Sequence, residues 1–327
     1  MTEKQKKKIK NTFKTAKVVP PALCRRLFAR RSYSPRDEKN LRAEVILTAD
    51  WHTDGDPVRD RMDVLRRGLA GISDTKRVPD ALVIAGDLTN SAHECEYVNL
   101  KRILKYYSRV PVVIPEMGNH DSRGTDMEPV FQIGCDLFQD YCRFCGYEPL
   151  FNHFSTSVNG YPFIILGTDD IRQNEAYFSK EQLDWLDKEL ARCSEEGKPV
   201  FLVNHQPLME FPYVKEQWSG GSVGENSAEL WELLTKYTNK GLKILYIYGH
   251  LHVALTYKLF HEVSPNFYCL NLPSFEYGDK SKDNGVGDAG GCGFIMEVYD
   301  HEILLRCRNF TTGREYTEQE ATIKLDS

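Results

Sequence analysis

The chain has 327 residues, of which 41% are hydrophobic, 11% aromatic and 27% charged, and its formal net charge is −5. This composition is typical of a globular protein and excludes a disordered or fibrous one, and no apolar run approaches the roughly 18 to 20 residues that span a bilayer. Because no apolar segment of the kind found in a secretory signal follows the basic start, we expect a cytoplasmic protein whose nine cysteines are reduced thiols.

Positive charge is concentrated at the start of the chain. Residues 1–40 hold 13 Lys and Arg against 3 Asp and Glu, a net of +10, so the rest carries −15. We predict that residues 1–40 form a basic N-terminal extension. It is either a solvated tail or a basic amphipathic element, since Leu23, Leu27 and Phe28 recur at helical spacing among arginines. An amphipathic element would make weak contact with an anionic membrane surface or with RNA, and the former would place the protein peripherally at the membrane.

From residue 43 onward, short apolar runs alternate with longer amphipathic ones. The runs predict buried strands over Glu44–Ala49, Ala81–Ala85, Val110–Ile114, Phe163–Gly167, Val200–Asn204 and Ile244–Tyr248. Helical periodicity predicts helices over Pro57–Gly71, Glu94–Tyr107 and Ser179–Cys193. This alternation indicates an α/β sheet covered by helices.

Antiparallel pairing is also predicted. The Asn159-Gly160 pair between two apolar runs is a hairpin signal, so the sheets cannot be purely parallel. After residue 252 four more strands are expected without helices between them, over Ala254–Phe260, Phe267–Leu270, Gly293–Val298 and Ile303–Arg308. With no repeat and no second composition-defined unit, we predict one domain over residues 41–315 and a C-terminal tail over 316–327.

Asp, Asn and His residues follow the ends of five predicted strands. In chain order they are Asp50, His52, Asp87, Asn119, His120, Asp121, His205, His250 and His252. In open α/β sheets, ligands bind outside the carboxyl ends of strands. One such residue in a turn is ordinary, but five strand ends that all carry metal-ligand residue types predict a shared metal site.

The ligand types constrain the metal. Carboxylate, amide oxygen and imidazole without thiolate suit Mn, Fe or Zn and disfavour a structural zinc site built from cysteines. The candidate ligands suit two ions that share a bridging carboxylate better than one tetrahedral ion; they are Asp50, His52, Asp87, Asn119, His205, His250 and His252. Two ions about 3.5 to 4 Å apart hold both the attacking and the leaving oxygen of an in-line displacement.

The order of these motifs, D-x-H, G-D, G-N-H-D, H and G-H-x-H, resembles the calcineurin-like metallophosphoesterases over residues 44–252. The segment Val78–Ala92 is most similar to the branch that contains class III cyclic-nucleotide phosphodiesterases and glycerophosphodiesterases. The resemblance implies a four-layer α/β/β/α sandwich, in which two mixed sheets pack face to face and helices lie outside.

The resemblance also implies a role for each site residue. One metal would be held by Asp50, His52, Asp87 and His252, and the other by Asp87, Asn119, His205 and His250. A hydroxide bridging the metals would attack the phosphorus, and His120 would protonate the leaving alkoxide or stabilise the phosphorane. The protein Ser/Thr phosphatase branch has an aspartate where this chain has Asn90. We therefore expect Asn90 to orient His120, place Asp121 in the same catalytic group, and favour the phosphodiesterase-like branch.

The expected function is hydrolysis of small or nucleotide-like phosphodiesters, with no specific protein partner. A phosphomonoesterase or a nuclease would use the same site, but the acidic body and the lack of a basic aromatic stripe argue against nucleic acid. A catalytically silent scaffold is disfavoured because every ligand position and His120 are filled.

Overall fold

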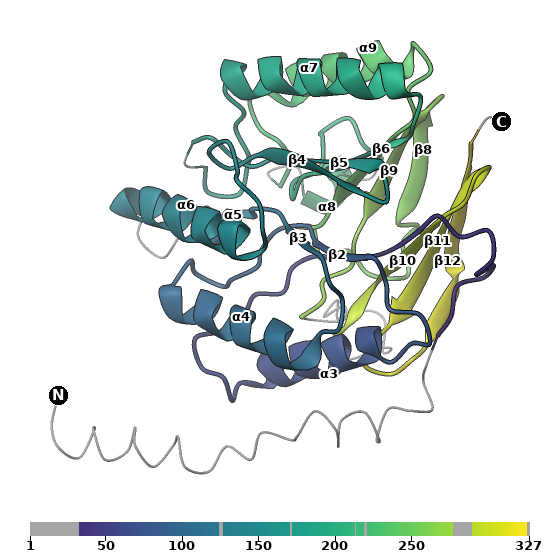
Figure 1. Cartoon of the computed structure of the whole chain (residues 1–327). Coiled ribbons are helices and arrows are strands. Elements are labelled where there is room, and N and C mark those ends of the chain that lie inside the picture. Colours follow the sequence, from purple (N-terminus) through teal and green to yellow (C-terminus); the bar gives the residue numbers. More distant parts are fainter. Residues whose placement is uncertain are drawn as a thin grey trace, which may run out of the picture.

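Two six-stranded β-sheets face each other at the centre of the molecule (Figure 1). The computed structural model describes residues 33–123, 127–170, 172–212, 214–218, 221–276 and 290–325. Most of the expected basic extension, including Leu23, Leu27 and Phe28, therefore lies outside the described residues.

The first sheet has the strand order β12-β11-β10-β1-β2-β3. Its strands are β1 (Ala43–Thr48), β2 (Ala81–Ile84), β3 (Val113–Pro115), β10 (Cys292–Val298), β11 (Glu302–Asn309) and β12 (Glu315–Lys324). Strands β1, β2 and β3 are parallel to one another, whereas β10 pairs antiparallel with β1. The sheet is therefore mixed, and its parallel half sends three carboxyl ends to one edge.

The second sheet has the order β4-β5-β6-β7-β9-β8. Its strands are β4 (Phe154–Val158), β5 (Tyr161–Ile165), β6 (Val200–Val203), β7 (Ile244–Tyr248), β8 (Phe260–Ser264) and β9 (Phe267–Asn271). The predicted hairpin at Asn159-Gly160 is confirmed, because β4 and β5 pair antiparallel on either side of it. The strand expected over Ala254–Phe260 is wrong: residue 257 closes a turn back to Ala254, and β8 begins only at Phe260.

Alternate residues of the second sheet enter two separate cores. On β6, Phe201 and Val203 pack in the core shared with the first sheet, whereas Val200 and Leu202 pack against the outer helices. This alternation follows from the period of two along a strand. The helices are α3 (Asp60–Ser73), α4 (Glu94–Tyr107), α5 (Asn119–Arg123), α6 (Met127–Phe144), α7 (Lys180–Glu196), α8 (Val214–Trp218) and α9 (Ser227–Thr238).

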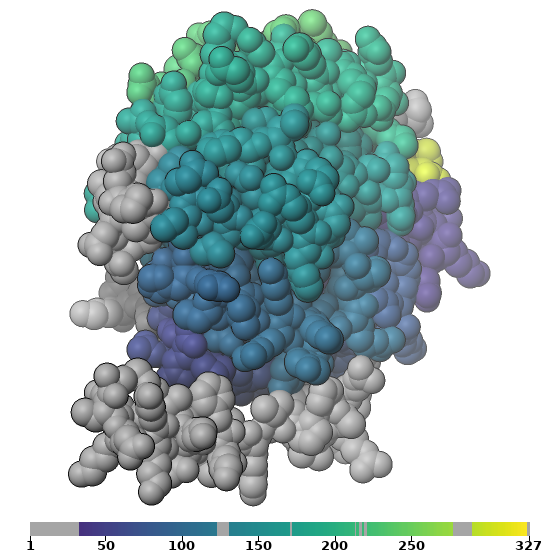
Figure 2. Space-filling model, turned by 60° about the vertical axis from the view of Figure 1, so that its left-hand side comes forward, coloured from purple at the N-terminus to yellow at the C-terminus, as the bar shows by residue number. Residues whose placement is uncertain are grey.

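The helices complete the layers. Helices α3 and α4 lie side by side on one outer face, and α7 and α9 on the other (Figure 1). In Figure 2 the early segments (blue) and the middle segments (teal to green) accordingly fill opposite halves of one face. The four-layer α/β/β/α sandwich is thus confirmed. None of the helices among the described residues is long and apolar enough to span a membrane.

Both predicted boundaries of the domain need correction. Residues 315–324 form β12, which pairs antiparallel with β11, so most of the expected tail belongs to the first sheet. At the other end, Tyr33 is only 5% exposed and donates its hydroxyl hydrogen to the carbonyl of Ile72 at 3.1 Å. The backbone N–H of Arg36 donates to the Glu297 carboxylate at 2.9 Å. The folded unit therefore includes residues 33–40, because their contacts cover buried groups of the first sheet.

Candidate metal centre

The predicted ligands meet where the two sheets present the carboxyl ends of their parallel strands. The first sheet supplies those that follow β1, β2 and β3, and the second sheet those that follow β6 and β7. Backbone hydrogen bonds tie these ends together, such as Asp50 N–H to the carbonyl of Gly86 at 3.1 Å and Gly249 N–H to that of His205 at 3.1 Å. We call this region the metal centre. Donor atoms of six predicted ligands gather in it, those of Asp50, His52, Asp87, His205, His250 and His252. Asn119 lies beside them, because the N–H of the next residue, His120, donates to Oδ1 of Asp87 at 2.9 Å.

Five of these residues adopt left-handed backbone conformations. Their φ angles are 55° at Asp50, 44° at His52, 49° at Asp87, 68° at His250 and 46° at His252. Positive φ is uncommon outside glycine, and such strained residues gather at functional sites. Here the turn redirects each side chain toward the other loops as the chain leaves its strand.

Glycines before the ligands allow the loops to approach closely. A Cβ on Gly118 would lie 2.2 Å from Oδ1 of Asp87, and one on Gly249 would lie 2.5 Å from Oδ2 of Asp50. Both distances are far below van der Waals contact, so a side chain at either position would displace a carboxylate. The recurring glycine in the G-N-H-D and G-H-x-H motifs thus has a steric cause.

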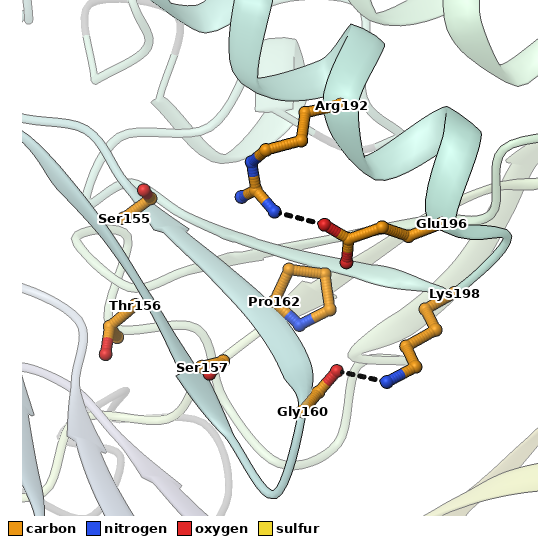
Figure 3. A pocket seen from close by; sticks show the side chains of 8 residues that line it. All are labelled: Ser155, Thr156, Ser157, Gly160, Pro162, Arg192, Glu196 and Lys198. Carbon is orange, nitrogen blue, oxygen red and sulfur yellow. Dashed lines mark hydrogen bonds and ion pairs between the residues drawn. The ribbon is translucent and has the colours of Figure 1, made fainter.

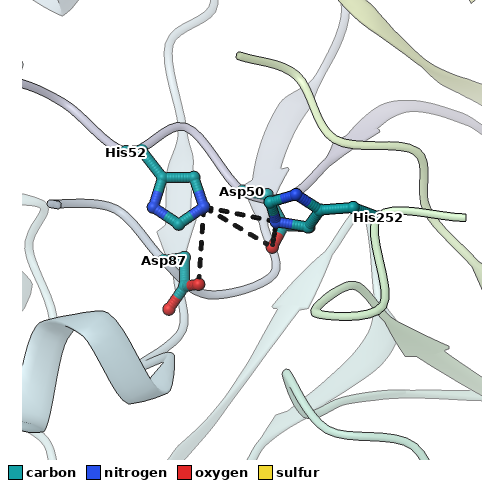
Figure 4. A group of neighbouring side chains, drawn as sticks. All are labelled: Asp50, His52, Asp87 and His252. Carbon is teal, nitrogen blue, oxygen red and sulfur yellow. Dashed lines mark hydrogen bonds and ion pairs between the residues drawn. The ribbon is translucent and has the colours of Figure 1, made fainter. Parts of the chain in front are cut away.

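The first ligand group contains Asp50, His52, Asp87 and His252, whose donor atoms all lie within 4.8 Å of one another (Figure 4). Nε2 of His252 is 2.9 Å from Oδ1 of Asp50, and Nε2 of His52 is 3.6 Å from Oδ2 of Asp87. The two imidazole Nε2 atoms are 3.3 Å apart. Two imidazoles and two carboxylates thus point at one small volume.

The second group contains Asp87, His205 and His250. Nδ1 of His205 is 2.9 Å from the carbonyl oxygen of Ala85, which can only accept, so Nδ1 carries a hydrogen and Nε2 is the ring atom that faces the centre. Buried Oδ1 of Asn119 and Nε2 of His250 have no hydrogen-bond partner among the described residues. Such atoms are what a bound metal would satisfy, so the residues fit one.

Burial and charge determine the protonation of the centre. Burial lowers the pKa of His52 to about 3 and that of His250 to about 3, which leaves both imidazoles neutral. Burial opposes ionisation of Asp87, but the attraction of His205 outweighs it and holds the pKa of that carboxyl well below its usual range. Burial opposes protonation of His205, but Asp87 and Asp50 raise its pKa to about 10, so His205 is protonated without metal and an ion bound at Nε2 would displace that proton. Neutral imidazoles and ionised carboxylates are the forms that bind metals.

The imidazole of His120 is held by a backbone carbonyl. Its Nδ1 lies 2.7 Å from the carbonyl oxygen of Asn90, and its backbone N–H donates to Oδ1 of Asp87 at 2.9 Å. The Asn90 side chain instead accepts a hydrogen bond from Arg61 at 2.8 Å and donates one to Ser91 at 3.1 Å. The expectation for Asn90 is therefore corrected: its main chain, which any residue carries, makes the bond to His120.

Asp121 binds backbone groups of two loops beside the centre, and its place in the catalytic group stays a prediction. Its fully buried carboxylate accepts hydrogen bonds from the N–H groups of Leu88, Thr89 and Gly118 at 3.0, 2.8 and 3.0 Å. The Thr89 hydroxyl donates a fourth at 2.7 Å. These bonds join the loop after β2 to the loop after β3. Burial, reinforced by Asp87, raises the pKa of Asp121 to about 7.

Two residues near the centre were missed as site residues by the sequence analysis. The ring of Trp218 stacks on that of His250, with centroids 4.9 Å apart and planes 24° from parallel. Arg61 lies in the first turn of α3 and contacts the loop of His52. Trp218 stands in a glycine-rich segment that follows His205, which was a usable signal. Arg61 occupies an ordinary polar position of an amphipathic helix, so nothing in the sequence marked it.

A hollow on the second sheet lies apart from this centre (Figure 3). It is lined by the β4–β5 hairpin, the end of α7 and Lys198, which precedes β6, whereas His205 follows the opposite end of β6. Its cations are already engaged: Arg192 pairs with Glu196 at 2.5 Å, and Lys198 donates to the Gly160 carbonyl at 2.8 Å. The hollow is therefore no part of the metal centre.

Comparison with known proteins agrees with this geometry. The sequence model of the calcineurin-like phosphoesterases matches residues 43–254. The chain belongs to that family and is a hydrolase that acts on phosphoester bonds.

Its relatives include two bacterial proteins. A probable cyclic nucleotide phosphodiesterase of Rhodococcus erythropolis is 32% identical over 80% of this chain and 82% of its own. A probable glycerophosphodiester phosphodiesterase of Arcobacter nitrofigilis is 26% identical over 65% of this chain and 72% of its own. A solved dimetal phosphatase from Danio rerio shares the fold, with a TM-score of 0.57, 14% identity and coverage of 88% and 100% of the two chains.

Proposed function

We propose that this protein is a binuclear metal-dependent phosphodiesterase of small or nucleotide-like substrates. The observation that carries the proposal is the position of Asp87, whose carboxylate belongs to both ligand groups. A carboxylate shared in this way is what two neighbouring ions require. The names of both bacterial relatives specify phosphodiesters, which supports a diester over a monoester.

Each group would hold one ion. Asp50, His52, Asp87 and His252 would bind the first, and Asp87, Asn119, His205 and His250 the second. The oxygen and imidazole donors suit Mn, Fe or Zn. Bound ions would polarise the phosphoryl oxygens and lower the pKa of a coordinated water. The protein supplies the rigid loops, the shared carboxylate and the buried environment that keep this geometry.

His120 would transfer a proton to the leaving group. Because Nδ1 donates to the Asn90 carbonyl, Nε2 is the ring atom that exchanges a proton with the substrate oxygen. The acid form is then the imidazolium, and it returns to the Nδ1–H tautomer after the transfer. An alkoxide leaving group needs this proton far more than nitrophenolate does.

Two other uses of the site are less well supported. A phosphomonoesterase would need the same ligands, and only the substrate would distinguish it. A nuclease would need a cationic surface, whereas the chain after residue 40 carries a net charge of −15.

We also propose a peripheral membrane location, on the basis of the +10 charge of residues 1–40.

The test compares two nitrophenyl substrates on protein stripped with chelator and reloaded with Mn²⁺, Fe²⁺ or Zn²⁺. We expect bis(nitrophenyl) phosphate to be hydrolysed faster than nitrophenyl phosphate, with close to two ions per chain by elemental analysis. Asp87→Ala should bind fewer ions and lose turnover by more than 10²-fold, because it removes a contact to both ions. Full activity of metal-free protein would contradict the proposal. Faster hydrolysis of the monoester would show that the protein is a phosphomonoesterase instead.

A further inference from the structure

Arg61 reaches from α3 into three of the loops that build the metal centre. Its Nη1 donates to the carbonyl oxygen of His52 at 3.2 Å and to Oδ1 of Asn90 at 2.8 Å. Its Nε lies 2.7 Å from Oε1 of Glu276, in an ion pair whose side chains are 16% and 1% exposed. One guanidinium thus joins the loops after β1, β2 and β9.

Each contact falls on a loop that carries a reacting part of the centre. His52 is a candidate ligand, held in a left-handed turn with φ of 44°. Asn90 provides the carbonyl that accepts from Nδ1 of His120 at 2.7 Å. The backbone N–H of Glu276 donates to the carbonyl oxygen of Asp50 at 3.1 Å. Replacing Arg61 would therefore remove the hydrogen bond that holds the Asn90 side chain, and with it support for His120, while every ligand side chain stays present.

The chemistry of arginine suits this place. A guanidinium is planar and offers five donors in fixed directions, whereas a lysine ammonium is a single point on a flexible stem. A nearly buried guanidinium needs a counter-charge, which Glu276 supplies. Because Glu276 neutralises the guanidinium charge, Arg61 orients the loops through its hydrogen bonds and adds little positive charge that could attract the substrate.

We infer that Arg61 is a positioning residue for His120: it fixes Asn90 so that the Asn90 carbonyl holds the imidazole with Nδ1 protonated and Nε2 toward the leaving group. This inference rests on the proposed function, in which His120 protonates the leaving oxygen. Arg61 itself transfers no proton and binds no metal.

The variants are Arg61→Gln and Arg61→Lys, with Arg67→Gln as the matched control. Arg67 lies on the same helix and pairs with Asp63 on that helix at 2.9 Å, so its loss should change neither metal content nor turnover. For Arg61→Gln, metal content should stay close to that of the wild type. Turnover of an alkyl phosphodiester should fall roughly tenfold to a hundredfold, and that of a nitrophenyl diester much less. Arg61→Lys should lie nearer to the glutamine variant than to the wild type.

A double-mutant cycle with His120→Asn separates this role from others. If Arg61 acts through His120, Arg61→Gln in the His120→Asn background should lower alkyl diester turnover by less than about twofold. In zinc-loaded protein, ¹⁵N NMR of the histidine rings should show that His120 loses its preference for the Nδ1–H tautomer when Arg61 is replaced. Both results together would support the inference.

Three results would overturn it. Equal losses on alkyl and nitrophenyl diesters, with lower metal content, would mean that Arg61 supports His52 and the ligands instead. A loss that persists in the His120→Asn background would exclude action through His120. If His120→Asn itself changes nothing while the wild type hydrolyses diesters with bound metal, the acid role and this inference both fall, but the metallophosphodiesterase stands.

Discussion

Oδ2 of Asp87 lies 3.1 Å from Nε2 of His205, although Asp87 follows a strand of the first sheet and His205 a strand of the second. Asp50 is likewise 2.9 Å from His252, which follows β7. The metal centre therefore spans the interface between the two sheets. Ions held there would connect the two halves of the sandwich as well as serve catalysis.

Metal removal should accordingly lower the thermal stability of the fold. A ligand that binds only the native state adds about 2.7 kcal/mol at a hundred times its dissociation constant, so reloading stripped protein should raise Tm by several degrees. Asp87→Ala should show no such rise at the same metal concentration. His261→Ala, which removes a histidine outside the centre, should keep it. An unchanged Tm on stripping and reloading the wild type would show that the ions do not join the sheets.

Asp121 should matter for stability and loop geometry more than for chemistry. Asp121→Ala leaves the buried N–H groups of Leu88, Thr89 and Gly118 without their acceptor. Each lost partner is worth about 1 to 3 kcal/mol, so we expect the unfolding free energy to fall by at least about 3 kcal/mol in urea titrations. Asp136→Asn, at an exposed site on α6, is the control. A variant that keeps wild-type stability and metal content but loses turnover would place Asp121 in the catalytic group.

Glu44 should make the protein less stable as the pH rises. It lies opposite Glu297 in the β1–β10 ladder, is buried, and neither carboxylate oxygen has a hydrogen-bond partner among the described residues. Burial, followed by repulsion from Glu297, raises the pKa of Glu44 from 4.5 to about 7. The folded state thus holds the proton that the unfolded state releases first. The stability that protonated Glu44 adds to the folded state is fully present below about pH 4.5 and is lost as the pH rises to about 7.

Glu44→Gln removes this dependence because an amide does not ionise. Relative to the wild type, the variant should gain about 1 to 3 kcal/mol of unfolding free energy at pH 8 and little at pH 4.5. Glu318→Gln, an exposed change on β12, should show no such difference. The measurement is urea unfolding at both pH values. An equal effect of Glu44→Gln at both would contradict the assigned shift.

Two truncations test where the folded unit begins. A chain that starts at residue 33 keeps Tyr33, whose carbonyl accepts from Thr75 at 2.9 Å, and should match the full chain in stability and turnover. A chain that starts at Asp37 lacks Tyr33. It also loses the hydrogen bond from the Arg36 N–H to Glu297 and the one from Arg306 to the Ser34 carbonyl. It should be less stable by about 3 kcal/mol, since a buried aromatic ring is removed. Equal stability of the two would restore the boundary at residue 40.

The same pair of truncations tests the membrane proposal. If residues 1–32 bind anionic surfaces, only the full chain should sediment with phosphatidylserine vesicles, and salt should release it as the screening length falls from about 10 Å to 3 Å. Vesicles of neutral lipid are the control. Identical sedimentation of the full chain and the chain that starts at residue 33 would eliminate the anchor.

Much of the fold and most of the site were predictable because they follow local rules. The short continuous apolar run Val200–Val203 marks a strand that is buried on both faces, and Asn159-Gly160 marks a hairpin. The candidate ligands were predictable because each lies within four residues after the end of a strand. The predicted start of a helix at Ser179 is confirmed, since the Ser179 hydroxyl accepts a hydrogen bond from the Gln182 N–H and α7 begins at the next residue.

The residue patterns by themselves determined an α/β sheet covered by helices and which side chains meet at the strand ends, because short apolar runs, helical periodicity and strand-end position are local properties; the four-layer sandwich was implied by the resemblance to a known family. Only the tertiary structure decided that the carbonyl of Asn90, and not its side chain, holds His120. It alone placed Asp121 beneath the backbone of Leu88 and Thr89, Arg61 among three loops, and Tyr33 against the first sheet. These contacts join residues far apart in the chain through backbone groups that every residue carries, so no residue type marks them in advance.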